Sequence, residues 1–169
     1  MESTHEPVSL PTSEISTHSG IKISWPHLVL GLIGIAISFY TVILHNQIKA
    51  GGGCGAGDCE AVIGSKYGAL FGIPVGVFGM LFYAVIILLS IVTKGSTATA
   101  RQIAAQRLVV SALGLASALA FFYISHMVIR AFCPYCMATH TTTLLVFIVS
   151  LIGYLKVRRQ DQSSSSSTL

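Results

Sequence analysis

Two pairs of cysteines have the residue types and the spacing for reversible disulfide chemistry. Cys133 and Cys136 form the sequence Cys-Pro-Tyr-Cys, in which two intervening residues let both sulfurs meet at the first turn of a helix. The positive end of the helix dipole favours a thiolate at that place. The other cysteines, Cys54 and Cys59, lie in a glycine-rich stretch. The pattern predicts a protein that moves electron pairs through dithiols and disulfides.

Composition indicates what must position these cysteines. The chain has 169 residues, of which 53% are hydrophobic and only 9% are charged, and its mean hydropathy is +0.75. That leaves too little polar surface for a soluble globule. Apolar segments at residues 28–48, 73–92, 108–132 and 137–155 are each close to the roughly 20 residues that cross a bilayer. We predict an all-α integral membrane protein, a four-transmembrane-helix bundle at residues 25–157, between disordered tails at 1–24 and 158–169.

The distribution of basic residues predicts the orientation of the bundle. With four spans, both tails and the second loop share one side, which carries seven basic residues, whereas the other side carries three: Lys49, Lys66 and Arg130. Positive charge accumulates on the cytoplasmic side of membrane proteins. We expect cytoplasmic termini and an extracytoplasmic loop, between the first and second helices, that carries Cys54 and Cys59. The net charge of +4 then follows from topology, and no nucleic-acid partner is expected.

Glycines surround the loop cysteines, with Gly51 to Gly53 before Cys54 and Gly55 and Gly57 between the pair. Glycine adopts unusual dihedral angles at little steric cost, so the two cysteines can pair at one moment and separate at another. The simpler alternative is that the glycines only connect two helices. Residues 60–66 are expected to form a short interfacial helix. Small residues such as Gly76 and Gly79 in the second span are expected to form a packing seam.

Static alternatives use the same cysteines. Two structural disulfides are possible in an extracytoplasmic loop, but a Cys133–Cys136 bridge would join nothing distant. A four-cysteine zinc site, or a transporter that passes a soft metal between the pairs, also has suitable ligands. Zinc ribbons mount their cysteines on tight knuckles, whereas here one pair opens a transmembrane helix, so no metal site is predicted. The redox interpretation needs an acceptor, and a lipid-soluble quinone suits a thiol at the end of a membrane helix.

A family resemblance rests on these residues together with a few others. Cys54, Cys59, Ser65, the Phe-Gly-Ile-Pro sequence at residues 71–74 and the Cys-Pro-Tyr-Cys at 133–136 occur in that order across four spans. Over about residues 28–155, this arrangement resembles the vitamin K epoxide reductase (VKOR) family, in particular its bacterial-type members. The resemblance implies a four-helix bundle around a quinone, of ubiquinone or menaquinone (vitamin K) type, with the loop capping the pocket.

The resemblance also implies a function in the bacterial inner membrane, equivalent to that of DsbB. Such members reoxidise a periplasmic thioredoxin-like, or DsbA-like, protein and pass the electrons to membrane quinone. Many members carry a fused thioredoxin-like domain; here the partner is expected to be a separate protein. Two alternatives remain: reduction of vitamin K epoxide or quinone as the end function, and transport of a soft metal.

Roles for individual residues follow from the resemblance. It implies that Cys54 exchanges with the partner, that Cys59 passes the disulfide exchange to Cys133, and that Cys136 donates electrons to the quinone. Four more residues are expected at the quinone: Ser65, Phe71, Thr139 and His140. The helix start and Arg130 are expected to lower the thiol pKa of the inner pair, unless Arg130 extends to the lipid headgroups instead.

Overall fold

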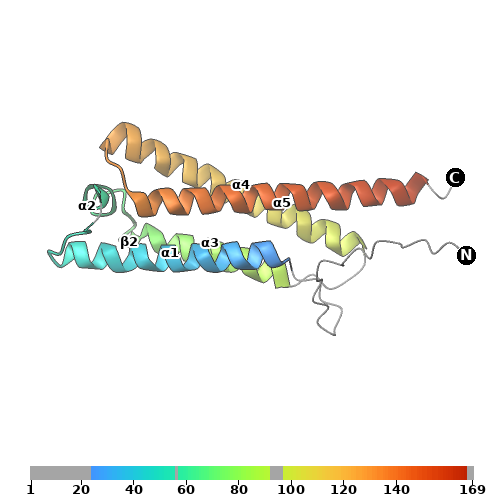
Figure 1. The fold of residues 1–169 in the computed structure, drawn as a ribbon, viewed down its shortest axis with the longest axis horizontal. Helices are drawn as coiled ribbons and strands as arrows, with labels where there is room; N and C mark the ends of the chain where they lie inside the picture. The colour runs from blue at the N-terminus through green and yellow to red at the C-terminus, as the bar shows by residue number, and fades with distance from the viewer. Residues whose placement is uncertain (1–23, 56, 92–96, 167–169) are drawn as a thin grey trace, which may run out of the picture.

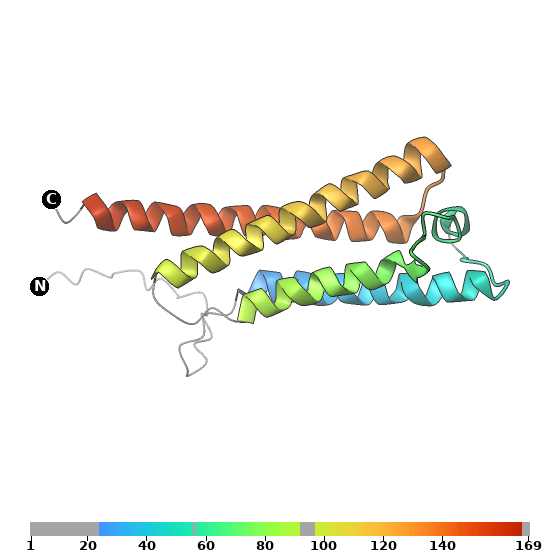
Figure 2. The ribbon, with the colours of Figure 1, turned by 180° about the vertical axis from the view of Figure 1, so that it is seen from behind.

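The computed structural model describes residues 24–55, 57–91 and 97–166. Four long helices run along one axis, with a short helix and a hairpin at one end of the bundle (Figure 1). In chain order the elements are α1 (Trp25–Lys49), α2 (Cys59–Ile63), β1 (Ala69–Leu70), β2 (Ile73–Pro74), α3 (Val75–Ile91), α4 (Thr97–Tyr123), the π-helix η1 (Ile124–Ile129) and α5 (Pro134–Ser166). Helix α1 packs on α3 and α5, and α4 crosses α5, as the view from behind also shows (Figure 2).

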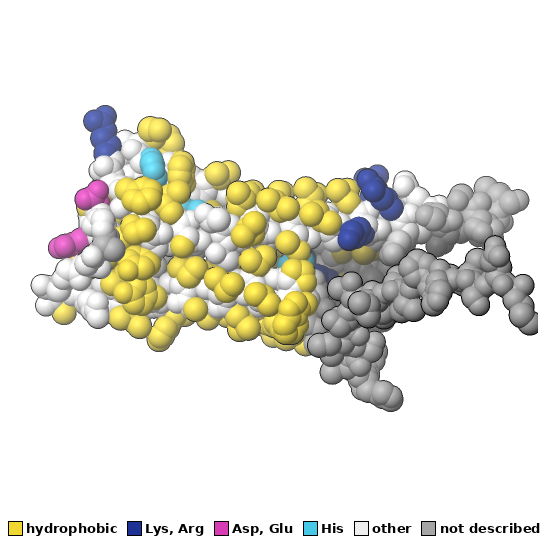
Figure 3. All heavy atoms as spheres, viewed as in Figure 1, with side chains coloured by type: hydrophobic (Ala, Val, Ile, Leu, Met, Phe, Trp, Pro, Cys, Tyr) yellow, Lys and Arg dark blue, Asp and Glu magenta, His cyan; other side chains and the backbone are white. Residues whose placement is uncertain are grey.

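Within the described residues, three helical segments are long and apolar enough to cross a membrane. They are Trp25–Lys49, Arg101–Ile129 and Pro134–Gln160, and the shorter apolar helix Val75–Ile91 packs beside the first. Hydrophobic side chains cover the middle of the bundle, with acidic side chains at one end and basic ones toward both ends (Figure 3). Many large apolar side chains are exposed along the helices, such as Leu32, Leu113 and Ile152. An apolar surface of this extent belongs in lipid, so the prediction of an all-α membrane protein is confirmed.

Prolines mark two of the helix starts. Pro26 lies in the first turn of α1, and Pro134 is the first residue of α5. The missing N–H of proline costs nothing there, because the first amides of a helix have no intrahelical partner. In α5 this places Cys133 immediately before the helix and Cys136 within its first turn.

Helix α5 is longer than predicted. Residues 158–166, expected as part of a disordered tail, continue the helix to Ser166. The segment Lys-Val-Arg-Arg-Gln at 156–160 contains good helix formers and no proline or glycine, so nothing ends the helix where the apolar residues end. The tail predicted at residues 1–24 lies outside the described residues except for Ser24.

A small hairpin precedes α3 and was not predicted. Strands β1 and β2 pair antiparallel, with Ala69 opposite Pro74 and Leu70 opposite Ile73. The two turn residues, Phe71 and Gly72, have φ angles of 52° and 81°. Positive φ at both central residues is the type I′ geometry that suits tight hairpins. The interfacial helix expected at residues 60–66 is the shorter α2.

The seam between α1 and α3 depends on glycines. A Cβ atom on Gly79 would lie 2.7 Å from Ser38 Oγ, and one on Gly76 would lie 2.7 Å from the Ser38 carbonyl oxygen. Below the seam, Tyr83 is fully buried and its hydroxyl donates to the Thr139 carbonyl at 3.1 Å. The same hydroxyl pairs with Thr143 Oγ1 at 2.9 Å. These contacts join α1, α3 and α5, which lie on three sides of the space between the helices.

Candidate functional site

All four cysteines meet at one end of the bundle. Cys54, Cys59 and Cys133 are buried together, and Cys136 packs against them. The thiol of Cys59 is hydrogen-bonded to both Cys54 and Cys133, and Cys133 is hydrogen-bonded to Cys136. All four are thiols in the structure. The sulfurs therefore form a row in the order Cys54, Cys59, Cys133, Cys136.

The start of α5 positions the inner pair. Cys133 Sγ accepts the backbone N–H of Cys136 at 3.3 Å, in the way that a capping side chain accepts from the first turn of a helix. The Cys133 carbonyl accepts the N–H of Met137 at 3.0 Å. Between the cysteines, the ring of Tyr135 packs against Tyr40 of α1, with 5.0 Å between ring centroids. The helix start is thereby held against α1.

A backbone hydrogen bond ties the loop to this helix start. The Asp58 N–H donates to the Phe132 carbonyl at 3.1 Å, directly before Cys59 and Cys133 in their two segments. Gly57 reaches this position with a φ of +56°, and a Cβ there would lie 3.0 Å from the same carbonyl oxygen. By contrast, Cβ atoms on Gly53 and Gly55 would meet nothing within 4 Å. The loop is thus docked at Asp58, and the glycines on either side of Cys54 have open space around them.

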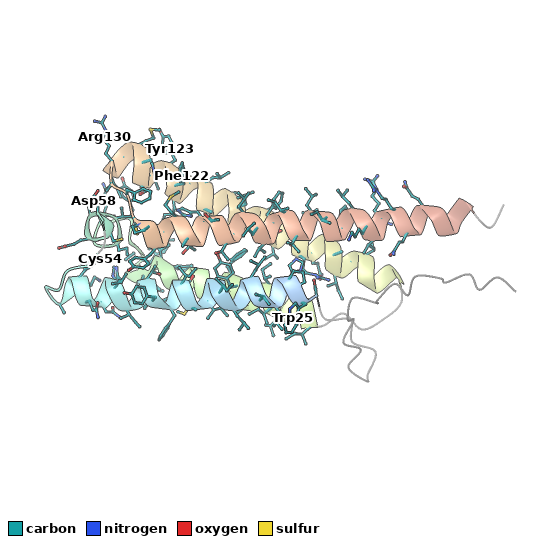
Figure 4. The ribbon with its side chains drawn as sticks, in the orientation of Figure 1. Trp25, Cys54, Asp58, Phe122, Tyr123 and Arg130 are labelled. Carbon is teal, nitrogen blue, oxygen red and sulfur yellow. The ribbon has the colours of Figure 1, made fainter. Side chains whose placement is uncertain are left out.

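The two central thiols have raised pKa values. Burial raises the pKa of Cys59, and its hydrogen bond to Cys133 raises it further. The pKa of Cys133 is raised chiefly by its hydrogen bond to Cys136 and next by burial, which together outweigh the opposing N–H of Cys136. The expected lowering of the pKa at Cys133 is therefore wrong for this dithiol state. Arg130 is exposed and its side chain points away from the bundle (Figure 4).

A cavity of about 380 Å³ lies between the long helices, under the loop. Its walls are mainly apolar, and polar residues line it from several of the surrounding elements. Cys136, Thr139, His140 and Thr143 line it from α5, and Ser38, Thr41 and His45 line it from α1. Cys136 is the cysteine that borders this cavity, so the row of sulfurs ends at its wall.

The structure separates the four residues expected at a quinone into two groups. Thr139 and His140 line the cavity, whereas Ser65 and Phe71 do not. The Ser65 hydroxyl donates to the Val62 carbonyl at 2.8 Å and accepts the N–H of Tyr67 at 3.2 Å, so it closes the turn after α2. Phe71 is 94% exposed at the tip of the hairpin. Contact of these residues with a quinone stays a prediction.

Several residues of the cavity wall escaped the sequence analysis. Tyr83, His45 and Ser38 are buried and line the cavity. The signal for His45 was present, because an ionisable side chain within an apolar span is rare without a function. Tyr83 and Ser38 gave no signal, because tyrosine and serine are ordinary in membrane helices. Among the described residues, no group of three or more His, Cys, Asp or Glu is arranged to hold a metal ion.

Comparison with models of known protein families shows which family the chain belongs to. The model that matches is that of the vitamin K epoxide reductase family, over residues 25–151. The chain belongs to the vitamin K epoxide reductase family. The match runs from the first residue of α1 into α5, and so includes the four cysteines and every residue of the cavity wall. Members of the VKOR family are oxidoreductases associated with quinones and vitamin K, which assigns this membrane protein to redox chemistry. No individual curated protein matches the chain.

Proposed function

We propose that this VKOR-family protein is a quinone-linked thiol oxidoreductase that generates disulfides. It takes an electron pair from a separate thioredoxin-like, DsbA-like protein at Cys54 and Cys59, and passes the pair through Cys133 and Cys136 to membrane quinone. The observation that supports this most is the row of four sulfurs that ends with Cys136 at the cavity wall. A static staple would not need a chain of neighbouring thiols that leads to a cavity.

The outer exchange begins with a Cys54–Cys59 disulfide. A partner thiolate attacks Cys54, which forms a mixed disulfide and releases Cys59 as a thiolate. The second partner thiol then attacks the mixed disulfide, so the partner leaves oxidised and Cys54 and Cys59 remain as a dithiol. Cys54 is 8% exposed in the described state, so the loop must open for this step, and the glycines around Cys54 make such opening cheap.

The inner exchange uses the contact between Cys59 and Cys133. Cys59 attacks Cys133 of a Cys133–Cys136 disulfide and releases Cys136, and Cys54 then attacks Cys59. The loop disulfide forms again, and the electron pair now resides on the Cys133–Cys136 dithiol. Each exchange breaks one S–S bond and forms another, so electrons move inward without an external redox agent.

The cavity fits a quinone on its own chemistry. At about 380 Å³ with mainly apolar walls, it lies within the roughly 300–1,000 Å³ of small-molecule sites. Two buried polar atoms on its wall, Ser38 Oγ and His45 Nε2, have no hydrogen-bond partner among the described residues, as expected of a site that binds a polar headgroup. A bound quinone supplies an acceptor of two electrons and two protons. Cys136, at the cavity wall, would give the electron pair to a quinone held there and close its bridge with Cys133.

The membrane arrangement completes the proposal. We take α3 as the fourth span: its 17 residues are about 26 Å long at 1.5 Å per residue, close to the ~30 Å hydrocarbon core. The distribution of basic residues then favours both termini in the cytoplasm of a bacterium and the cysteines on the outer side of its inner membrane. The cysteine cluster lies at the end of the bundle opposite Trp25, which agrees with this orientation (Figure 4).

Quinone reduction by the purified protein in detergent tests the function. The protein is supplied with dithiothreitol or a reduced thioredoxin-like protein, and quinol formation is followed by absorbance. We expect thiol-dependent quinol formation that is lost in Cys136→Ala and retained in Met137→Ala, whose side chain is adjacent on α5 but does not line the cavity. Failure of the unaltered protein to reduce quinone overturns the proposal. Faster reduction of vitamin K epoxide than of quinone replaces it with the epoxide reductase function.

A further inference from the structure

His45 on α1 is a buried histidine with one nitrogen in use and one without a partner. It is 3% exposed, and its Nδ1 lies 3.0 Å from the Ile63 carbonyl oxygen. A carbonyl oxygen only accepts hydrogen bonds, so Nδ1 carries the hydrogen and the neutral ring has a lone pair on Nε2. Nε2 is buried and has no hydrogen-bond partner among the described residues. Buried polar atoms are almost always paired, so this orphan requires an explanation.

The orphan nitrogen belongs to a residue of the cavity wall. His45 lines the cavity together with Thr41 and Ser38 from the same face of α1. The Thr41 hydroxyl is satisfied by the Ser38 carbonyl at 2.7 Å, whereas Ser38 Oγ has no partner and its residue is only 1% exposed. The α1 wall therefore holds two unsatisfied polar atoms next to a mainly apolar space. A ligand with a polar headgroup removes that penalty, and a purely apolar ligand does not.

His45 also lies at the cysteine end of the cavity. The preceding residue, Leu44, packs in the cysteine cluster, and Ile63, which holds Nδ1, belongs to the same cluster. Cys136 borders the cavity from the opposite helix, α5. Ser38 lies two helical turns before His45 in α1, roughly 10 Å away along the helix axis and farther from the cysteines. Of the two orphans, His45 is the one near the sulfur that gives up electrons.

We propose that His45 binds an oxygen of the quinone through Nε2 and carries a proton to that oxygen when Cys136 delivers its electrons. The inference rests on the proposed function. Oxidation of the Cys133–Cys136 dithiol to a disulfide releases two electrons and two protons, and reduction of quinone to quinol consumes the same. Nε2 takes one released proton and passes it on, so His45 ends neutral, as it began. The hydrogen on Nδ1 stays there throughout, because it is held by the hydrogen bond to the Ile63 carbonyl.

His140 faces the same cavity from α5 but differs in its surroundings. Its ring contacts Phe122 edge-on, with 6.3 Å between centroids, and no backbone carbonyl holds one of its nitrogens in the described structure. The tautomer of His45, by contrast, is set by the protein. A fixed tautomer presents the same atom to the ligand in every cycle, which is what proton transfer at a defined oxygen needs.

Two substitutions separate binding from proton transfer. In His45→Asn the amide nitrogen stands near Nδ1 and retains the bond to Ile63, but nothing replaces Nε2. In His45→Gln the amide reaches the place of Nε2 and can donate a hydrogen bond, but it cannot carry a proton. The matched control is His27→Asn, because His27 is on the same helix, is equally buried at 2% and bonds Ser150 outside the cavity.

The first measurement is binding without turnover. Equilibrium binding of a short-chain ubiquinone is measured in a Cys136→Ala background. We expect His45→Asn to raise the Kd about tenfold, the loss of one hydrogen bond to a buried group, whereas His45→Gln and His27→Asn stay within about threefold of the background. The second measurement is quinol formation with intact cysteines, where both His45 variants should be slower by about a hundredfold, the low end for a lost proton-transfer group.

The outcomes separate this inference from the function on which it rests. If the unaltered protein reduces quinone while both His45 variants bind and reduce it normally, the role of His45 is refuted and the function stands. If the unaltered protein does not reduce quinone, the function itself fails. Thiol counts after mixing with a reduced partner should be unchanged in the His45 variants, because the cysteine exchanges precede the cavity. A loss of partner oxidation there would also refute the assignment, since it would mean that His45 supports the cysteines instead.

Discussion

Gly57→Ala should release the cysteine loop from the start of α5. Gly57 has a φ of +56°, and a Cβ there would lie 3.0 Å from the Phe132 carbonyl, the acceptor that docks the loop through Asp58. Placing an L-residue in the left-handed region costs about 1–2 kcal/mol, before any displacement of that carbonyl. The docked state should therefore lose a factor of about 5–30 relative to the open state.

Alkylation of Cys59 measures this equilibrium directly. Cys59 is fully buried when the loop is docked, so a water-soluble maleimide reaches its thiol only through opening. Where opening and closing are faster than alkylation, the labelling rate follows the open fraction. The fully reduced protein is labelled and the modified cysteine is identified by mass spectrometry. We expect Cys59 in Gly57→Ala to be labelled about 5–30 times faster than in the unaltered protein.

A matched control is available in the same loop. Gly53→Ala adds the same methyl group where nothing lies within 4 Å and the backbone is not in the left-handed region. Labelling of Cys59 in Gly53→Ala should stay near the unaltered rate. Equal acceleration in both variants, or none in Gly57→Ala, would show that loop docking does not depend on the Gly57 conformation and would refute the reasoning.

Two other predictions concern stability. The pKa values of Cys59 and Cys133 are raised above their ordinary value, so the folded protein holds these protons more tightly than the unfolded chain. The stability that this provides is present below about pH 9 and is lost as pH rises further. Melting temperatures of the reduced protein between pH 7 and 10 should therefore fall above pH 9. A fall of equal size in the double variant Cys59→Ser/Cys133→Ser would contradict the cause, since serine does not ionise there. Gly79→Ala places a Cβ 2.7 Å from Ser38 Oγ and should destabilise the α1–α3 seam by about 1–3 kcal/mol. Adding Ser38→Ala should restore part of this loss in thermal unfolding, and an additive effect of the two changes would argue against the contact.

The buried state of Cys54 bears on how the protein would meet its partner. The described structure holds all four thiols, and Cys54 is nearly inaccessible in it. In the proposed cycle all four are thiols together only when a second partner reduces the loop disulfide before quinone has oxidised the Cys133–Cys136 dithiol. A docked loop keeps the internal exchange short, and an open loop lets the partner reach Cys54. The Asp58–Phe132 hydrogen bond is the contact that must break and form again between these steps.

Several features of the site could be predicted from residues close together in the sequence. The Cys-Pro-Tyr-Cys segment lies at a helix start because a proline there is both compatible with the first turn and preceded by a break in the apolar run. The two cysteine pairs are together at one end of the bundle, as the spans and the loop implied. Thr139 and His140 follow Cys136 at one-turn spacing, and they line the cavity with it.

Other features depended on contacts between distant segments. Ser65 was expected at a quinone, yet its hydroxyl is taken by two backbone groups of its own turn. Phe71 lies at an exposed hairpin tip, whose type I′ turn is unusual for a phenylalanine and gave no signal in the sequence. The pKa of Cys133 rises because Cys136 and the surrounding apolar side chains act on it together, whereas the dipole of its own helix suggested the opposite.

The sequence by itself determined that the chain forms apolar helices, which elements carry the cysteines and that the cysteines form two pairs. These follow from local rules, because a chain in lipid must satisfy its backbone hydrogen bonds within each helix. Only the tertiary structure decided which helix faces enclose the cavity, that His45 in its wall has an unpaired nitrogen, and that the sulfurs form a row. A helix that is apolar all round carries no periodic pattern to mark its inner face, so that face is set by packing against the other helices.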